Sequence, residues 1–132
     1  MTEFRRLTRD DFPILARWLA EPHVAEWWNH DPDAIDADFG PSIDEDEPAE
    51  DWIALDDGRP FGVVQYCHFV DYPEYIDELA SVYPLVEGAA SIDYLVGDHE
   101  RLGRGVGTRM IADFVDLVWA HDPRATHLVV PV

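Results

Sequence analysis

The sequence contains no lysine and only one cysteine, and its low content of these residues limits the partners and cross-links that the chain can have. Its nine basic side chains are all arginine, against 28 Asp and Glu, so the formal net charge is −19. A chain this acidic is not expected to bind nucleic acid or anionic membrane, because both would repel it. With Cys67 alone, no disulfide can form within the chain, which is the usage expected of a cytoplasmic protein.

Long hydrophobic runs are also absent. No stretch approaches the roughly 18 apolar residues of a membrane span, and the N-terminus (MTEFRRLTRDD) lacks the apolar segment of a signal peptide. At 132 residues the chain can bury one core but not two, so we expect a single domain over residues 1–132. Cys67 lies in an apolar segment, which favours a buried structural thiol over a nucleophile.

Basic residues are missing from one long window of the chain. Between Arg17 and Arg59 there is no arginine, but there are fourteen Asp and Glu. Solubility or salt adaptation would explain this acidity, and so would a surface that attracts a cationic substrate. Composition leaves both interpretations open.

Hydrophobic periodicity and turn signals predict a mixed α/β domain, with Asp57-Gly58 as a hairpin turn. Short apolar runs predict five strands: Phe4–Leu7, Trp52–Leu55, Pro60–Phe69, Ala90–Val96 and Thr126–Val130. Helical spacing predicts four helical segments: Asp10–Ala20, a short turn in His23–Asn29, Asp33–Phe39 and Gly105–Ala120. Two polar stretches are expected to be loops, the second with at most one helical turn: Gly40–Glu50 and Asp71–Glu87.

Glycine alternates at the start of the last predicted helix, in the segment LGRGVGTR (102–109), with Arg101 just before it. A helix start with small residues offers free N–H groups and a positive dipole end, which suit a phosphate. The segment lacks the Lys-Ser/Thr of a P-loop, and its GxGxG spacing does not match the dinucleotide pattern. Close packing of the helix on the sheet is the alternative role for these glycines.

At these residues the chain resembles the GCN5-related N-acetyltransferase (GNAT) superfamily, whose phosphate loop reads Gln/Arg-x-x-Gly-x-Gly/Ala. Gly105 and Gly107 match the two small residues, whereas Leu102 departs from the usual Gln or Arg. The likeness is greatest to aminoglycoside 6′-N-acetyltransferases, which similarly have Leu at that position and an Ile-Asp pair like Ile92-Asp93. Siderophore-type lysine N-acyltransferases form a sister group, with His near the position of Asp93.

The resemblance implies acetyl-CoA as the acetyl donor and an amine as the acceptor, with no metal. It assigns Asp93 as the catalytic base. The acceptor is implied to contact Trp27, Trp28, Gln65 and Asp93. The donor is implied to contact Tyr94, Leu95, Val96, Leu102, Gly103, Arg104, Gly105, Val106, Gly107 and Thr108.

Residue types alone leave simpler roles open for the same side chains. Asp93 could merely face solvent, the tryptophans could be core residues, and Gln65 could lie on the solvent side of an edge strand. The six histidines show no metal-ligand spacing and have no cysteine pair beside them, so no metal site is predicted.

The resemblance also predicts where this chain differs from the family. After the fifth strand the family continues with an Asn-containing loop, a helix with a Tyr that serves as general acid, and two more strands. We therefore expect a GNAT-like mixed α/β sheet flanked by helices, truncated after the fifth strand and lacking the C-terminal segment. An exposed last strand would favour pairing with another chain, such as a homodimer partner. The predicted function is aminoglycoside 6′-N-acetylation, as in antibiotic resistance. The alternatives are lysine N-acylation and a non-catalytic acetyl-CoA-binding or dimerisation module.

Overall fold

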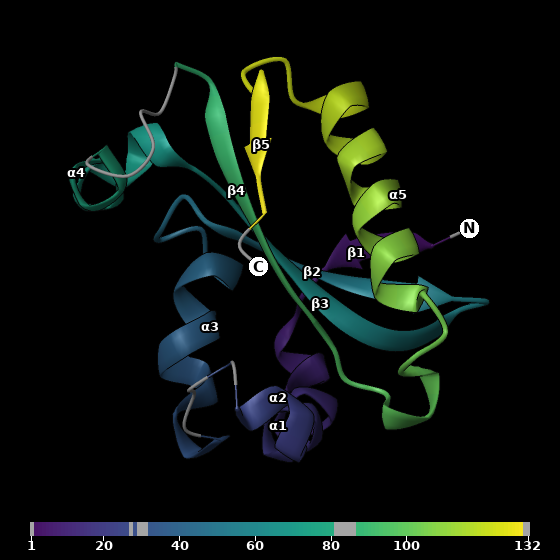
Figure 1. The fold of residues 1–132 in the computed structure, drawn as a ribbon. Coiled ribbons are helices and arrows are strands. Elements are labelled where there is room, and N and C mark those ends of the chain that lie inside the picture. Colours follow the sequence, from purple (N-terminus) through teal and green to yellow (C-terminus); the bar gives the residue numbers. More distant parts are fainter. Residues whose placement is uncertain (1, 27, 29–31, 81–86, 131–132) are drawn as a thin grey trace.

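The computed structural model describes residues 2–26, 28, 32–80 and 87–130. Its five strands form one sheet. The strands lie side by side in chain order (Figure 1). The first four pair antiparallel, and the fifth runs parallel to the fourth. The strands are β1 (Glu3–Arg6), β2 (Glu50–Asp56), β3 (Arg59–His68), β4 (Ala89–Val96) and β5 (His127–Val129). The predicted mixed α/β fold is confirmed.

Helices cover both faces of the sheet (Figure 1). One face carries α1 (Phe12–Ala20), α2 (Pro22–Ala25) and α3 (Ile35–Ile43). The other carries α5 (Val106–His121), which connects β4 to its parallel neighbour β5. Across the described ranges, no helix is both long and apolar enough to span a membrane.

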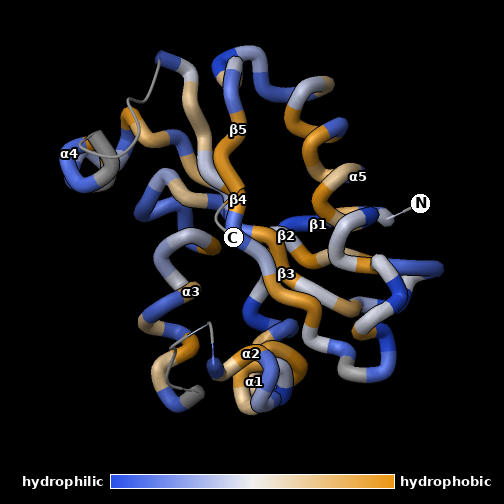
Figure 2. Tube along the Cα trace, viewed as in Figure 1, coloured by the Kyte–Doolittle hydropathy of each residue, from blue (hydrophilic) through white to orange (hydrophobic). Residues whose placement is uncertain are grey.

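Alternate residues of the strands build two separate cores. Val64 in β3 and Ile92 in β4 pack under α5 with Met110 and Phe114, all at most 1 % exposed. Val63 packs with the residues of α1–α3 on the opposite face. Figure 2 shows this division as hydrophobic strands between amphipathic helices. Because side chains alternate along a strand, each strand is held from both sides.

The Asp57-Gly58 turn between β2 and β3 is confirmed. Both residues have positive φ, 50° and 77° respectively, as a two-residue turn between twisted strands requires.

Two of the predicted loops are helical over part of their length. The loop predicted for 40–50 is wrong at its start, because α3 continues through Pro41 to Ile43 and buries Ser42. The loop predicted for 71–87 contains α4 (Pro73–Ala80), which is longer than one turn. Pro73 is the first residue of this helix, where its missing N–H costs nothing, so it starts the helix instead of breaking it. Residues 81–86 lie outside the described part of the chain.

Candidate active site

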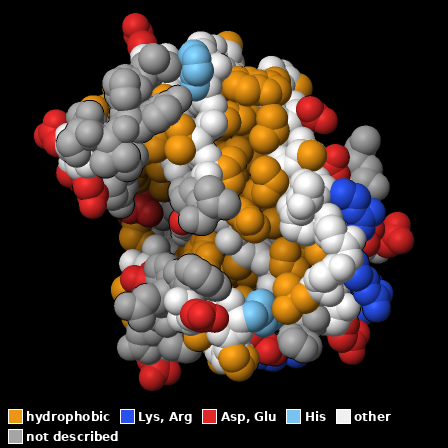
Figure 3. Space-filling model, viewed as in Figure 1, with side chains coloured by type: hydrophobic (Ala, Val, Ile, Leu, Met, Phe, Trp, Pro, Cys, Tyr) orange, Lys and Arg blue, Asp and Glu red, His pale blue; other side chains and the backbone are white. Residues whose placement is uncertain are grey.

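The candidate site lies where β4 and β5 separate. Only Ala89, Ala90 and Ser91 of β4 pair with β5, although β4 continues to Val96. A groove of about 940 Å³ opens along this unpaired part of β4. Figure 3 shows hydrophobic side chains in a band between β5 and α5 on the same face.

The structure brings most of the predicted site residues together in this groove. Donor and acceptor candidates both line it: Trp28, Gln65, Asp93, Tyr94, Leu95, Val96, Leu102, Gly103, Gly105, Val106, Gly107 and Thr108. Arg104 lines a neighbouring pocket instead, and Trp27 lies outside the described residues. His23, Val24, Ile111 and Val130 also line the groove and were not predicted as site residues.

The glycine loop closes one end of the groove at the start of α5. Gly103 and Gly105 have φ of 78° and 69°, a conformation that other residues adopt only with strain. Helix α5 begins at Val106, and its first backbone bond runs from the Arg109 N–H to the Gly105 carbonyl (3.1 Å). The N–H groups before Arg109 have no acceptor within the helix, so they are available to an anionic group.

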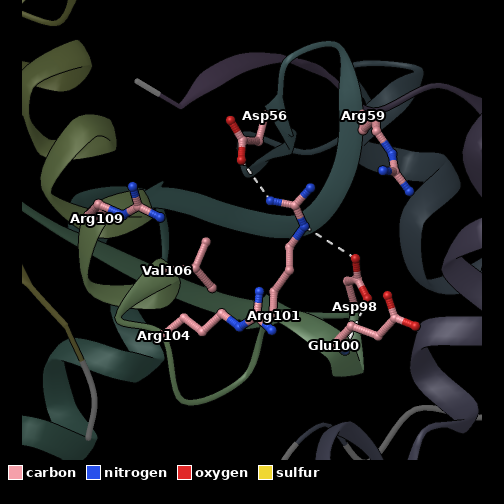
Figure 4. A pocket seen from close by; sticks show the side chains of 8 residues that line it. All are labelled: Asp56, Arg59, Asp98, Glu100, Arg101, Arg104, Val106 and Arg109. Carbon is pink, nitrogen blue, oxygen red and sulfur yellow. Dashed lines mark hydrogen bonds and ion pairs between the residues drawn. The ribbon is translucent and has the colours of Figure 1, made fainter.

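Four of the nine arginines gather beside the loop, in a second pocket of about 600 Å³ (Figure 4). Arg101 reaches between Asp56 (2.7 Å) and Asp98 (3.2 Å) and lies over the Phe61 ring. It therefore anchors the loop to the end of β2. The other three arginines of the pocket have no ion pair among the described residues: Arg59, Arg104 and Arg109.

Asp93 lies opposite Gln65 in the β3–β4 register, and both line the groove. The two residues have the same parity as Val63 and Leu95, so they belong to the α1–α3 face of the sheet. The Asp93 carboxylate is exposed and accepts a 3.2 Å bond from the next N–H in the strand. An exposed carboxylate beside an amide can hold an ammonium group and accept a proton from it.

Asp71 and Asp93 both place a negative charge near Cys67. Burial raises the pKa of the Cys67 thiol to about 11, and the charges of Asp71 and Asp93 add to this shift. The raised pKa keeps Cys67 protonated at neutral pH, as expected for a structural thiol rather than a nucleophile. The same charges favour a cation on this side of the groove.

The fold and the groove define an acyltransferase-like domain, and comparison with known proteins identifies its family. The family model for the acetyltransferase (GNAT) domain matches residues 8–132. The chain therefore belongs to the GNAT acetyltransferase family.

The relatives in this family include aminoglycoside acetyltransferases. Aminoglycoside N(6′)-acetyltransferase type 1 of Klebsiella pneumoniae is 28 % identical over 130 residues, covering 94 % of this chain and 62 % of the relative. The chain thus spans less than two thirds of that relative's length. The crystal structure of aminoglycoside acetyltransferase AAC(6′)-Ib with coenzyme A is similar with a TM-score of 0.81 and 25 % identity, over 98 % of this chain and 73 % of that one. The same values hold for its complex with coenzyme A and kanamycin.

Proposed function

We propose that this chain is a cytoplasmic acetyl-CoA-dependent N-acetyltransferase whose acceptor is a cationic aminoglycoside, modified at its 6′-amino group. The observation that carries this proposal is the shared groove. The glycine loop at one end and the exposed Asp93 carboxylate opposite Gln65 open into the same space. One chain can thus hold an anionic donor and a cationic acceptor side by side.

The donor half of the proposal rests on the start of α5 and the free edge of β4. The N–H groups of residues 103–108 would hold the pyrophosphate of acetyl-CoA, assisted by the positive end of the α5 dipole. The Arg104 guanidinium lies in the adjoining pocket and would add long-range attraction. The main chain of Tyr94, Leu95 and Val96 would line the path of the pantetheine arm, with Leu102 and Val106 beside it.

Asp93 would act as the general base. The substrate ammonium gives one proton to the carboxylate, and the resulting amine attacks the thioester carbonyl carbon. A backbone N–H of the β4 edge would stabilise the oxyanion that forms. The carbon–sulfur bond then breaks, the second amine proton goes to the thiolate, and Asp93 releases its proton to solvent.

The acceptor half rests on charge and on similarity. The charges of Asp71 and Asp93 suit a polyamine and disfavour an anionic substrate. Proteins of similar fold have been crystallised with coenzyme A and kanamycin, and the relative from Klebsiella pneumoniae is named for the 6′ position. Trp28 and Gln65 would border the acceptor. Trp27 is proposed for the same role from the sequence alone.

The test combines calorimetry with a free-thiol release assay. We expect the purified chain to bind acetyl-CoA and to release CoA thiol when kanamycin is added. Free lysine serves as the second acceptor, because its acetylation in place of kanamycin would indicate the lysine N-acyltransferase branch. Binding of acetyl-CoA without thiol release, across a panel of aminoglycosides and polyamines, would contradict the enzymatic proposal and indicate a binding module.

A further inference from the structure

The main chain of β4 presents two different edges. The Gly97 N–H donates to the Phe61 carbonyl of β3 (2.8 Å), and the Gly88 carbonyl accepts from the Thr126 N–H at the start of β5 (2.9 Å). Main-chain groups alternate in direction along a strand. The N–H and carbonyl groups of Tyr94 and Val96 therefore point to the β5 side, as those of Gly88 do.

Beyond Ser91 this edge of β4 has no strand partner among the described residues. Two side chains from α2 and the turn after it bind there instead. The Trp28 Nε1–H donates to the Tyr94 carbonyl (3.0 Å), and His23 Nε2 lies 2.8 Å from the Val96 carbonyl. Because a carbonyl oxygen only accepts, His23 must carry a proton on Nε2.

These two bonds join segments that are distant in sequence. They connect positions 66 and 73 residues apart, and both side chains line the groove. Trp28 is only 8 % exposed and packs with the α1–α3 core, so its indole is fixed in place. We name His23 and Trp28 the β4 clamp.

We propose that the β4 clamp positions the free end of β4 for the acyl donor. The clamp occupies the carbonyls of Tyr94 and Val96. On the same edge the Val96 N–H faces the groove, whereas the Tyr94 N–H donates to the Asp93 carboxylate (3.2 Å). The strand end beyond β5 would otherwise be held from one side only, and such ends open locally at low free-energy cost. This inference rests on the proposed function, since the donor it concerns is acetyl-CoA.

The first test needs no ligand. In His23→Leu, which removes the donor at similar volume, we expect the amides of Leu95 and Gly97 to exchange with deuterium about fivefold faster. His23→Gln, whose amide N–H can replace the imidazole donor, restores slow exchange. His121→Leu, at an exposed position near the end of α5, is the matched control and leaves both amides unchanged.

The second test separates positioning from stability. His23→Leu raises the KM for acetyl-CoA and the calorimetric Kd for CoA about fivefold to tenfold, and leaves the KM for kanamycin unchanged. Trp28→Phe should also raise the KM for acetyl-CoA and the Kd for CoA, with Trp119→Phe, on the exposed side of α5, as its control.

The outcomes distinguish the clamp from the proposed function. Wild-type protein that binds no CoA overturns the proposed function, whatever the exchange data show. If the wild type binds CoA but His23→Leu changes only kcat or the melting temperature, the clamp is structural and the inference is wrong. The inference is equally wrong if His23→Gln behaves as His23→Leu does.

Discussion

The two faces of the sheet use the same strands for different purposes. On the α5 face, the inward residues of β3 and β4 are apolar or form internal contacts, and they bury one helix. On the α1–α3 face, Asp51, Gln65 and Asp93 stand opposite one another on three neighbouring strands. We call these three residues the polar row. Because side chains alternate along each strand, the polar row leaves the core on the α5 side intact.

The two aspartates of this row differ in their surroundings. Asp51 is 4 % exposed, and its Oδ2 accepts a 2.5 Å bond from the Ser42 hydroxyl in α3. Asp93 is exposed in the groove. One carboxylate is built into the packing of a helix on the sheet, and the other is accessible to a substrate. We therefore expect Asp51 to matter for stability and Asp93 for turnover.

The largest expected effect is that of Asp93→Asn on turnover. An amide cannot accept the ammonium proton, so kcat should fall about 10²-fold or more. The melting temperature should stay unchanged, because the side chain is exposed. Asp116→Asn, at an exposed position of α5, is the control. Thiol release at the wild-type rate in Asp93→Asn would remove this residue from the mechanism.

The next effect concerns the glycine loop on the α5 side. Gly105→Ala places a side chain at φ of 69°, which costs about 1–2 kcal/mol, and it shifts the N–H groups that face the donor. We expect the KM for acetyl-CoA to rise about tenfold. Gly58→Ala, at φ of 77° in the hairpin turn, should cost similar stability and leave this KM unchanged. Equal KM values in the two variants would show that the loop does not bind the donor.

Ser42→Ala tests the structural aspartate. Removing a hydrogen bond to a buried carboxylate should lower the free energy of unfolding by about 2 kcal/mol, measured by urea denaturation. The kcat for kanamycin should remain at the wild-type value. Ser91→Ala, on the same face of β4 as Asp93, should change the free energy of unfolding by less than about 0.5 kcal/mol. A large loss of kcat in Ser42→Ala would place Asp51 in the reaction and erase the contrast with Asp93.

The smallest expected effect is on the pH dependence of stability, through Asp122 at the end of α5. Burial tends to raise the pKa of Asp122, but bonds from His68 (2.6 Å) and Tyr66 (2.7 Å) outweigh it, and the net pKa lies below the usual range. A lowered folded-state pKa stabilises the fold above the unfolded value, about 3.9, and the stabilisation is lost as pH falls through the folded value. Stability measured from pH 5 down to pH 2 should therefore fall less steeply in Asp122→Asn than in the wild type. Parallel curves would contradict this assignment.

The sequence predicts the α5 face better than the opposite face. The stripe of Val106, Met110, Phe114 and Val118 repeats at helical spacing, and all four are buried under α5. The glycine loop is equally predictable from the sequence. Positive φ favours glycine, so the backbone conformation of Gly103 and Gly105 leaves its mark on the residue type.

The α1–α3 side and α4 depend on contacts between distant segments. Helix α3 continues through Gly40-Pro41, a dipeptide that by itself predicts the end of a helix. The hydrogen bond from Ser42 to Asp51 holds the end of this helix on β2. The pairing of Gln65 with Asp93 is fixed by strand register, which hydrophobic pattern and long-range packing determine together. His23 gives no signal of its bond to β4, since that bond spans 73 residues.

We expect donor and acceptor to meet in one groove, the donor at the start of α5 and the acceptor on the α1–α3 face of the sheet. Amide chemical shifts of the labelled protein, recorded with CoA and then with kanamycin, test it most directly. CoA should shift the amides of residues 103–108 and of Tyr94 and Val96, and kanamycin should then shift those of Gln65 and Asp93. Kanamycin shifts confined to the acidic surface away from β4, with Gln65 and Asp93 unmoved, would contradict it.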